Sequence, residues 1–141
     1  MRLKSITVLM SVLLVGFGST LLWADTENEK TVLTGAAAWL GLIDNGQYSE
    51  SWKEASSYFQ NAVPEQRWAA SLEVVRKPLG RLISRRIVKS QEANSLPGAP
   101  DGRYVVMSFS TEFEHKKSAV ETVTFMLDED GAWRAAGYFI R

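Results

Sequence analysis

The chain has 141 residues, with 16 basic and 16 acidic side chains and no cysteine. This balance argues against a general nucleic-acid-binding protein, whose surface would be strongly basic. The lack of cysteine excludes disulfide frameworks, cysteine-ligated metals and thiol catalysis, so the fold must rest on its apolar core.

The N-terminal stretch has the pattern of a secretory signal peptide. Two basic residues, Arg2 and Lys4, precede an apolar run from Ile6 to Phe17, and the small residue Ala24 precedes a polar segment. We therefore expect cleavage after Ala24 and a periplasmic or secreted protein. The alternative is an uncleaved leader that anchors the chain in the inner membrane, because about 20 apolar residues can span a bilayer.

The remainder of the chain has the size of a single domain. Removing residues 1–24 leaves 117 of the 141 residues. The leader carries two bases and no acid, so this remainder has 14 basic against 16 acidic residues. We predict one domain over residues 25–141, with no stable membrane span after cleavage.

The first half of this domain shows the 3.6-residue spacing of helices. Three apolar stripes indicate three short helices: Leu33, Ala36, Ala37, Leu40 and Ile43; then Tyr48, Trp52, Ala55 and Phe59; then Trp68, Leu72 and Val75. Asn45-Gly46 ends the first helix, because both residues tolerate the left-handed conformation of a helix end. Ser51 and Glu54 have the spacing of a capping box for the second helix. Pro64 suits the first position of the third.

After Gly80 the pattern changes to that of strands. We predict strands over residues 81–90, 103–115, 118–127 and 133–140, a loop at 94–102 and a tight turn at 128–131. The stretch 103–115 alternates apolar and polar residues, as expected of an antiparallel strand with one buried face. The sequence therefore predicts an α+β fold, with about three N-terminal helices packed on a curved antiparallel sheet of about four strands.

Several segments carry a family resemblance. "PGAPDGRYVVMSFSTEF", "ETVTF" and "GAWRAAGYFI" resemble the bacterial domain-of-unknown-function family 4019, and "AAAWLGLIDNGQYSESWKEAS" is similar to its helical start. The resemblance covers about Ala36 to Arg141 and implies a small exported protein without an established activity. The helix-then-sheet order is also similar to the cone-shaped nuclear-transport-factor and ketosteroid-isomerase-like fold, which licenses no function by itself.

One carboxylate lies in an apolar register and is a candidate acid or base. Glu121 shares its strand alternation with Val123 and Phe125, and Tyr104, Arg134 or Tyr138 could be its partner. A buried carboxylate with such neighbours has the tuned pKa that acid–base catalysis requires. The alternative is that Glu121 lies at the start of a strand and is solvated.

Two further groups are candidates for binding. Arg134 and Tyr138 share one face of the last strand, beside a gap of small residues that leaves room for a ligand. Residues 76–89 carry six basic residues and no acid, and Arg85 and Arg86 could dock an anionic lipid headgroup, glycan or acidic partner. The alternative is a solvated strand, because alternation sends Arg85 and Arg86 to opposite faces.

The sequence carries no motif for a metal site, a cofactor site or a catalytic residue, and we predict none of the three. His115 is the only histidine and lies at a predicted hairpin tip, whereas a zinc site needs several converging ligands. The "DEDG" turn fails as a calcium loop, because Met126 and Gly137 would occupy its first and twelfth positions.

The function most consistent with this pattern is an exported, non-enzymatic binding or interaction domain of the cell envelope. Its partner would be an envelope ligand or protein, bound in an apolar pocket lined by Trp39, Trp52 and Trp68, unless these residues are plain core. One alternative is a small pocket enzyme that uses Glu121. Another is a structural envelope component held by an uncleaved leader.

Overall fold

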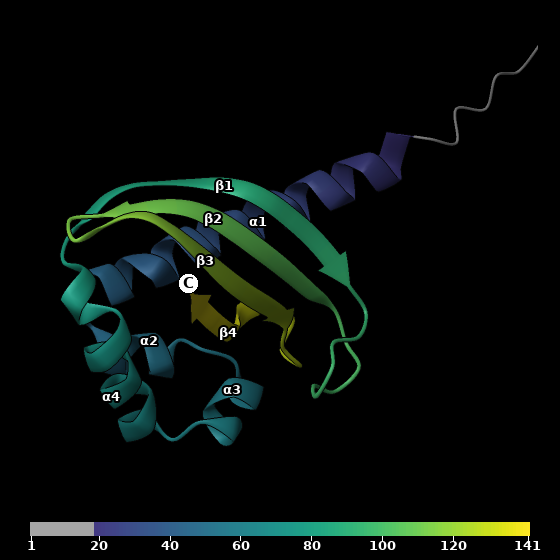
Figure 1. Ribbon diagram of the computed structural model, residues 1–141. Coiled ribbons are helices and arrows are strands. Elements are labelled where there is room, and N and C mark those ends of the chain that lie inside the picture. The colour runs from purple at the N-terminus through teal and green to yellow at the C-terminus, as the bar shows by residue number, and fades with distance from the viewer. Residues whose placement is uncertain (1–18) are drawn as a thin grey trace, which may run out of the picture.

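The structure is a computed structural model that describes residues 19–141 (Figure 1). Residues 1–18, which form most of the predicted leader, lie outside the described residues, so cleavage after Ala24 stays a prediction. Within the described part, no helix is long and apolar enough to cross a membrane.

Helices precede a four-stranded meander. The helices are α1 (Ser19–Asp44), α2 (Tyr48–Lys53), α3 (Ser57–Ala62) and α4 (Glu65–Val75), followed by the short 3-10 helix η1 (Lys77–Leu79). The strands are β1 (Leu82–Ala93), β2 (Tyr104–Phe113), β3 (Lys116–Leu127) and β4 (Trp133–Ile140). They pair antiparallel in the order β1-β2-β3-β4, and the sheet curves over the helices on its concave side (Figure 1). The predicted α+β class and four-stranded antiparallel sheet are confirmed.

Strand β2 shows why the alternating pattern was informative. Val105, Met107, Phe109, Thr111 and Phe113 are buried on the face toward the helices, whereas Val106, Ser108, Ser110 and Glu112 on the other face are partly exposed. The core also takes Val123 and Phe125 from β3. A period of two in the sequence therefore predicts a strand with one covered face.

The buried face of α1 differs from the predicted stripe. Its buried residues are Val32, Ala36, Trp39, Leu40 and Ile43. Ala37 is exposed, so including it was wrong, whereas Leu33 is partly buried and packs against the core. The helix is turned so that the large Trp39 ring enters the core, where it stacks on Trp68 at 6.0 Å between ring centroids. Burying the large indole side chain removes more apolar surface from water than burying an alanine, and therefore stabilises the fold more.

The predicted second helix is two helices, because the chain breaks at Ser56. This residue is extended, and its backbone N–H donates to the Ala135 carbonyl at 2.8 Å. Its hydroxyl accepts the backbone N–H of Phe59 at 3.1 Å, which caps α3. The helical hydrogen bonds lost at Ser56 are replaced by a bond to β4 and by an N-cap for α3.

The predicted capping box at Ser51 and Glu54 is wrong. Ser51 lies inside α2 and is fully buried. Its hydroxyl donates to the Tyr48 carbonyl at 2.6 Å and accepts the indole N–H of Trp68 at 2.9 Å. The indole N–H of Trp39 donates to the Ser51 carbonyl at 2.7 Å. Ser51 thus satisfies two buried indoles instead of a helix start.

The third predicted helix is confirmed with small changes at its ends. Pro64 is the N-cap, one residue before the predicted position, and Val75 at the last turn is exposed rather than buried. Gly80 ends the η1 turn at φ 76°, a conformation that favours glycine. A side chain there would also meet Glu114 and His115 at 2.9 Å, so glycine lets this turn approach the β2–β3 hairpin.

Ser56→Ala tests the break between α2 and α3. Loss of the cap should lower the free energy of unfolding by about 1 kcal/mol, and up to about 2, without changing the fold. Urea denaturation would measure it, with Ser71→Ala on the exposed face of α4 as the control, expected within about 0.5 kcal/mol of the wild type. Equal stability of both variants would contradict a structural role for the Ser56 cap.

Candidate functional site

Glu121 is fully buried in the concave face of the sheet. It is the sixth residue of β3 rather than its start, so the solvated alternative is wrong. One carboxylate oxygen accepts Thr111 Oγ1 and Arg85 Nε, both at 2.7 Å. The other accepts Arg85 Nη2 at 3.2 Å and the Tyr138 hydroxyl. Four donors therefore satisfy this carboxylate, which is the condition for burying it.

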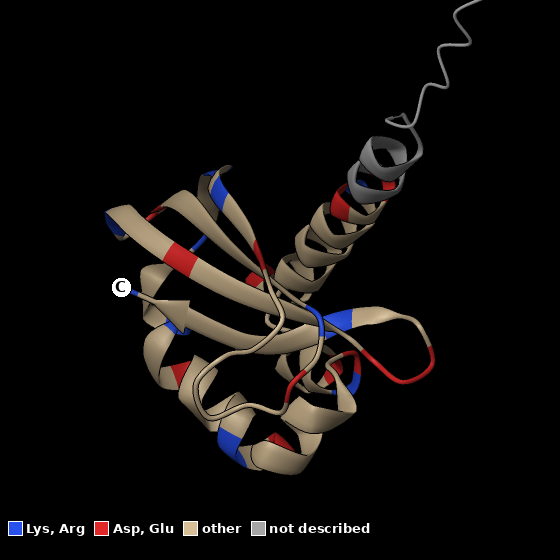
Figure 2. Ribbon diagram, turned by 90° about the vertical axis from the view of Figure 1, so that its right-hand side faces the viewer, with Lys and Arg blue, Asp and Glu red and all other residues tan. Residues whose placement is uncertain are grey.

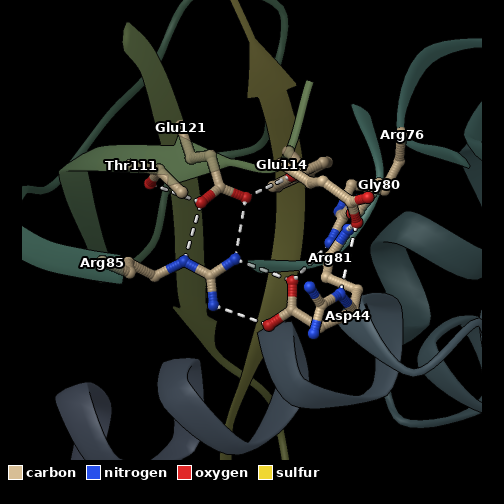
Figure 3. Close-up of polar contacts among 9 residues, drawn as sticks. Asp44, Arg76, Gly80, Arg81, Arg85, Thr111, Glu114 and Glu121 are labelled. Carbon is tan, nitrogen blue, oxygen red and sulfur yellow. Dashed lines mark hydrogen bonds and ion pairs between the residues drawn. The ribbon is translucent and has the colours of Figure 1, made fainter. Parts of the chain in front are cut away.

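The Arg85 guanidinium lies between two carboxylates from different layers of the fold (Figure 3). Opposite Glu121, its Nη1 and Nη2 donate to the Asp44 oxygens at 2.7 and 2.9 Å. The side chains of Arg85 and Asp44 are each 12% exposed. Burial opposes the charge of Arg85, but the hydrogen bonds to Asp44 and Glu121 outweigh it and raise its pKa.

A second arginine completes what we call the ion cluster, formed by Asp44, Arg76, Arg85 and Glu121. Arg76 is 2% exposed and donates to Asp44 at 3.2 Å and to the Gly80 carbonyl at 2.6 Å. Its guanidinium also lies 4.3 Å from the centre of the Phe113 ring. Asp44 ends α1, where the helix dipole disfavours an anion, and the two arginines offset that cost.

The ion cluster is balanced in charge, and among the buried side-chain polar atoms of the described residues only Arg76 Nε lacks a hydrogen-bond partner. Two carboxylates face two guanidiniums, and every oxygen of Glu121 has partners. A general base needs a lone pair that can reach a substrate. The geometry therefore favours a structural role for Glu121, tying β1 and β3 to the end of α1.

A separate hollow lies between α1, α2 and the β3–β4 hairpin, on the surface of the described residues. Its volume is about 370 Å³, and its lining is Gly35, Ala38, Trp39, Leu42, Glu50, Glu54, Phe125, Trp133 and Arg134. We call it the aromatic hollow. Trp39 and Phe125 are buried in its floor, whereas Trp133 is only partly covered.

Arg134 lines the aromatic hollow and is held by the β3–β4 turn. Its guanidinium donates to both oxygens of Asp130 at 2.8 and 2.7 Å and to Asp128 at 3.1 Å. The hydrogen bond from Arg134 lowers the pKa of Asp130 to about 2. Arg134 thus contacts the turn and not Glu121, whose partner among the predicted candidates is Tyr138.

The remaining predicted residues lie elsewhere. Tyr104 is buried under the β1–β2 loop, where its hydroxyl donates to the Pro100 carbonyl, and it does not reach Glu121. Arg86 is exposed on the face of β1 opposite to Arg85, as alternation predicted. Trp52 donates to the Val63 carbonyl at 2.7 Å and packs against the core rather than lining the aromatic hollow.

The basic stretch 76–89 does not form one patch. Four of its six basic residues are paired with carboxylates: Arg76, Lys77, Arg81 and Arg85. Only Arg86 and Lys89 have no ion pair with any residue in the described part of the chain. The stretch therefore stabilises the fold more than it charges the surface.

Sequence reasoning missed several residues that form these sites. Asp44 and Arg76 were not singled out, although a carboxylate as the last residue of a helix signals a compensating cation. Thr111 falls in the buried register of the alternating stretch 103–115, and a polar residue among apolar neighbours signals a buried hydrogen-bond partner. Glu50 carried no signal, because an acid on a short helix is ordinary, and Glu54 was assigned only to a capping box.

The comparisons identify a family but no function. The family model described as "Protein of unknown function (DUF4019)" matches residues 35–138, most of the chain, which confirms the family resemblance. No curated protein matches the chain. Among residues 19–141, no group of three or more His, Cys, Asp or Glu side chains is placed to hold a metal ion.

A double-mutant cycle tests the ion cluster. Arg85→Met leaves Glu121 without a cation and Asp44 with Arg76 alone, and should lower the free energy of unfolding by about 3–5 kcal/mol. Adding Glu121→Gln removes one of those charges, so the double variant should lose less than the sum of the single losses, by about 1–3 kcal/mol. Denaturant unfolding of the four proteins would measure this coupling.

Arg86→Met is the matched control, since Arg86 follows Arg85 in the sequence but is exposed to solvent. We expect a change within about 0.5 kcal/mol. Additive losses in the cycle, or an Arg86 variant as unstable as the Arg85 variant, would contradict a structural ion cluster.

Tyr138 makes the free energy of unfolding depend on pH in the alkaline range. Burial first, and then the charge of Glu121, raise the pKa of Tyr138 above its usual 10.0. Above pH 10 the unfolded chain releases this proton and the folded chain keeps it, so the free energy of unfolding falls as the pH rises. The fall approaches about 1.4 kcal/mol per pH unit for this one group.

Tyr138→Phe removes the titrating group, so its free energy of unfolding should fall less steeply. Urea unfolding of both proteins between about pH 9 and pH 11 would compare the slopes. Parallel profiles would mean that Tyr138 ionises alike in the folded and unfolded chains.

Proposed function

We propose that this chain, which belongs to the DUF4019 family, has a non-catalytic binding role in the cell envelope. The protein would hold a small ligand in the aromatic hollow. The predicted leader at residues 1–24 supports the envelope location. The placement of helices on the concave face of the sheet supports the likeness to cone-shaped folds, many of which leave a pocket between these layers.

One observation carries this proposal: apolar and polar groups converge on the aromatic hollow. The small residues Gly35 and Ala38 leave space on α1, and Trp133 supplies a large, partly covered ring. Glu50 and Glu54 stand at its α2 side. The volume of the hollow lies within the range of about 300–1,000 Å³ that is typical of small-molecule sites, and its surface is shared between apolar and polar groups.

The ion cluster argues against catalysis and so favours the binding role. Its carboxylates are already occupied by arginine, tyrosine and threonine donors, so an acid–base role would require those bonds to break. Glu121 is also absent from the lining of the aromatic hollow. A ligand there would meet Glu50, Glu54 and Arg134 instead.

Filling the hollow tests the proposal. Ala38→Leu adds three carbon atoms to its wall on α1, whereas Ala37→Leu adds them to an exposed neighbouring position outside the lining. Native mass spectrometry of protein purified from its own host should find a retained small molecule in the wild type and in the Ala37 variant. The Ala38 variant should lose most of it, because the added side chain occupies the space.

Both variants should unfold like the wild type, since leucine and alanine are both good helix formers. A wild-type protein that carries no small molecule, or an Ala38 variant that keeps it, would argue against binding in the aromatic hollow.

A further inference from the structure

We infer that the aromatic hollow recognises an organic cation, and specifically a quaternary ammonium group. This inference rests on the proposed binding function and names the ligand class of the same site. Three features carry it: the charges around the hollow, the aromatic ring at its wall and the apolar character of the rest of its surface.

The charges around the hollow are mainly negative. A second depression of similar volume shares Arg134 with it, and its lining includes Lys53, Asp128, Glu129 and Asp130. Together with Glu50 and Glu54, the two depressions present five carboxylates against two cations. Figure 2 shows the turn between β3 and β4 as a run of acidic residues. The whole chain has no net charge, so this excess is a local property of one side of the molecule.

The two cations of the lining are already bound, and a third, Arg103, lies over the ring of Trp133. Lys53 pairs with Glu50 at 3.3 Å, and Arg134 is held by Asp130 and Asp128. Glu54 lines the aromatic hollow and forms no ion pair with any residue of the described chain. The hollow therefore retains an unbalanced carboxylate, which attracts a cation and repels an anion.

Trp133 supplies the aromatic surface that organic cations prefer. A cation over an indole face is attracted by the quadrupole of the ring, and quaternary ammonium groups are the ligands most often bound in this way. The ring already makes one such contact, because the Arg103 guanidinium lies 5.5 Å from its centre. Trp133 is the least buried of the three aromatic residues in the lining, so it is the one that a ligand can reach.

The apolar part of the lining favours a methylated cation over a primary amine. Gly35, Ala38 and Leu42 offer no hydrogen-bond acceptor from their side chains. A primary ammonium is compact and strongly hydrated, and entry would strip its water without replacing all of its bonds. A trimethylammonium group presents carbon to these residues while its charge faces Glu54.

Choline and its neutral isostere 3,3-dimethylbutan-1-ol test the inference, because the two differ in charge and hardly in shape. Titration calorimetry with the wild-type protein should detect choline binding, and the isostere should bind at least tenfold more weakly. Glu54→Gln and Trp133→Leu should each weaken choline binding at least fivefold. Glu112→Gln, on the opposite face of the sheet, is the matched control and should leave it unchanged.

Vesicles distinguish the two sources of this group. Binding to phosphatidylcholine vesicles, but not to phosphatidylglycerol vesicles, would assign the ligand to a lipid headgroup. Binding of free choline without binding to either vesicle would assign it to a soluble compound. Either result supports recognition of a quaternary ammonium group.

Three results would overturn the inference: equal binding of choline and its isostere, preference for an N-acetyl-lysine amide over choline, or no choline binding at all. The proposed function can survive these results. If a host-derived molecule is still displaced by Ala38→Leu, the hollow binds a ligand of another class. If that molecule is also unaffected, both proposals fail.

Discussion

A carboxylate buried in an apolar sheet face sets the arrangement of this fold. Glu121 has no exposed surface, so its charge must be met by donors within the protein. They come from β1, β2 and β4, as Arg85, Thr111 and Tyr138. Register shifts in β1 on both sides of Arg85, at 82–84 and 87–89, bend the strand around it. Such irregularities re-aim a side chain, so the curved edge of the sheet and the position of Arg85 are linked.

The same constraint fixes α1 against the sheet. Arg85 offers more donors than Glu121 can accept, and its remaining N–H groups bind Asp44 at the helix end. Arg76 then joins the same carboxylate from the end of α4. Removing any one charge would leave the others unbalanced in a region of low dielectric. The ion cluster therefore joins the helical layer and the sheet in one relative position, and this holds α1 and α2 beside the β3–β4 hairpin.

How far the sequence predicts this structure depends on the range of the interactions. The alternation in residues 103–115 reflects one covered face, so strand β2 and its buried side follow from local pattern alone. The break at Ser56 does not, because helical spacing continues through it and the competing bond runs to Ala135 in β4. Glu121 was identified by its register. Its partners were only partly identified, since Asp44 and Arg85 are 41 residues apart and each, alone, resembles a solvated charge.

Runs of like charge in the sequence therefore do not predict the charge of the folded surface. The basic run at 76–89 is largely neutralised by carboxylates that the fold brings from α1, α4 and the β2–β3 hairpin. The acidic run at 128–130 meets one guanidinium, that of Arg134, and keeps its excess. Arg86 and Lys89, the exposed remainder of the basic run, lie on β1. If the aromatic hollow binds the organic cation proposed for it, this local excess of acidic residues would draw the cation toward the hollow before any contact is made.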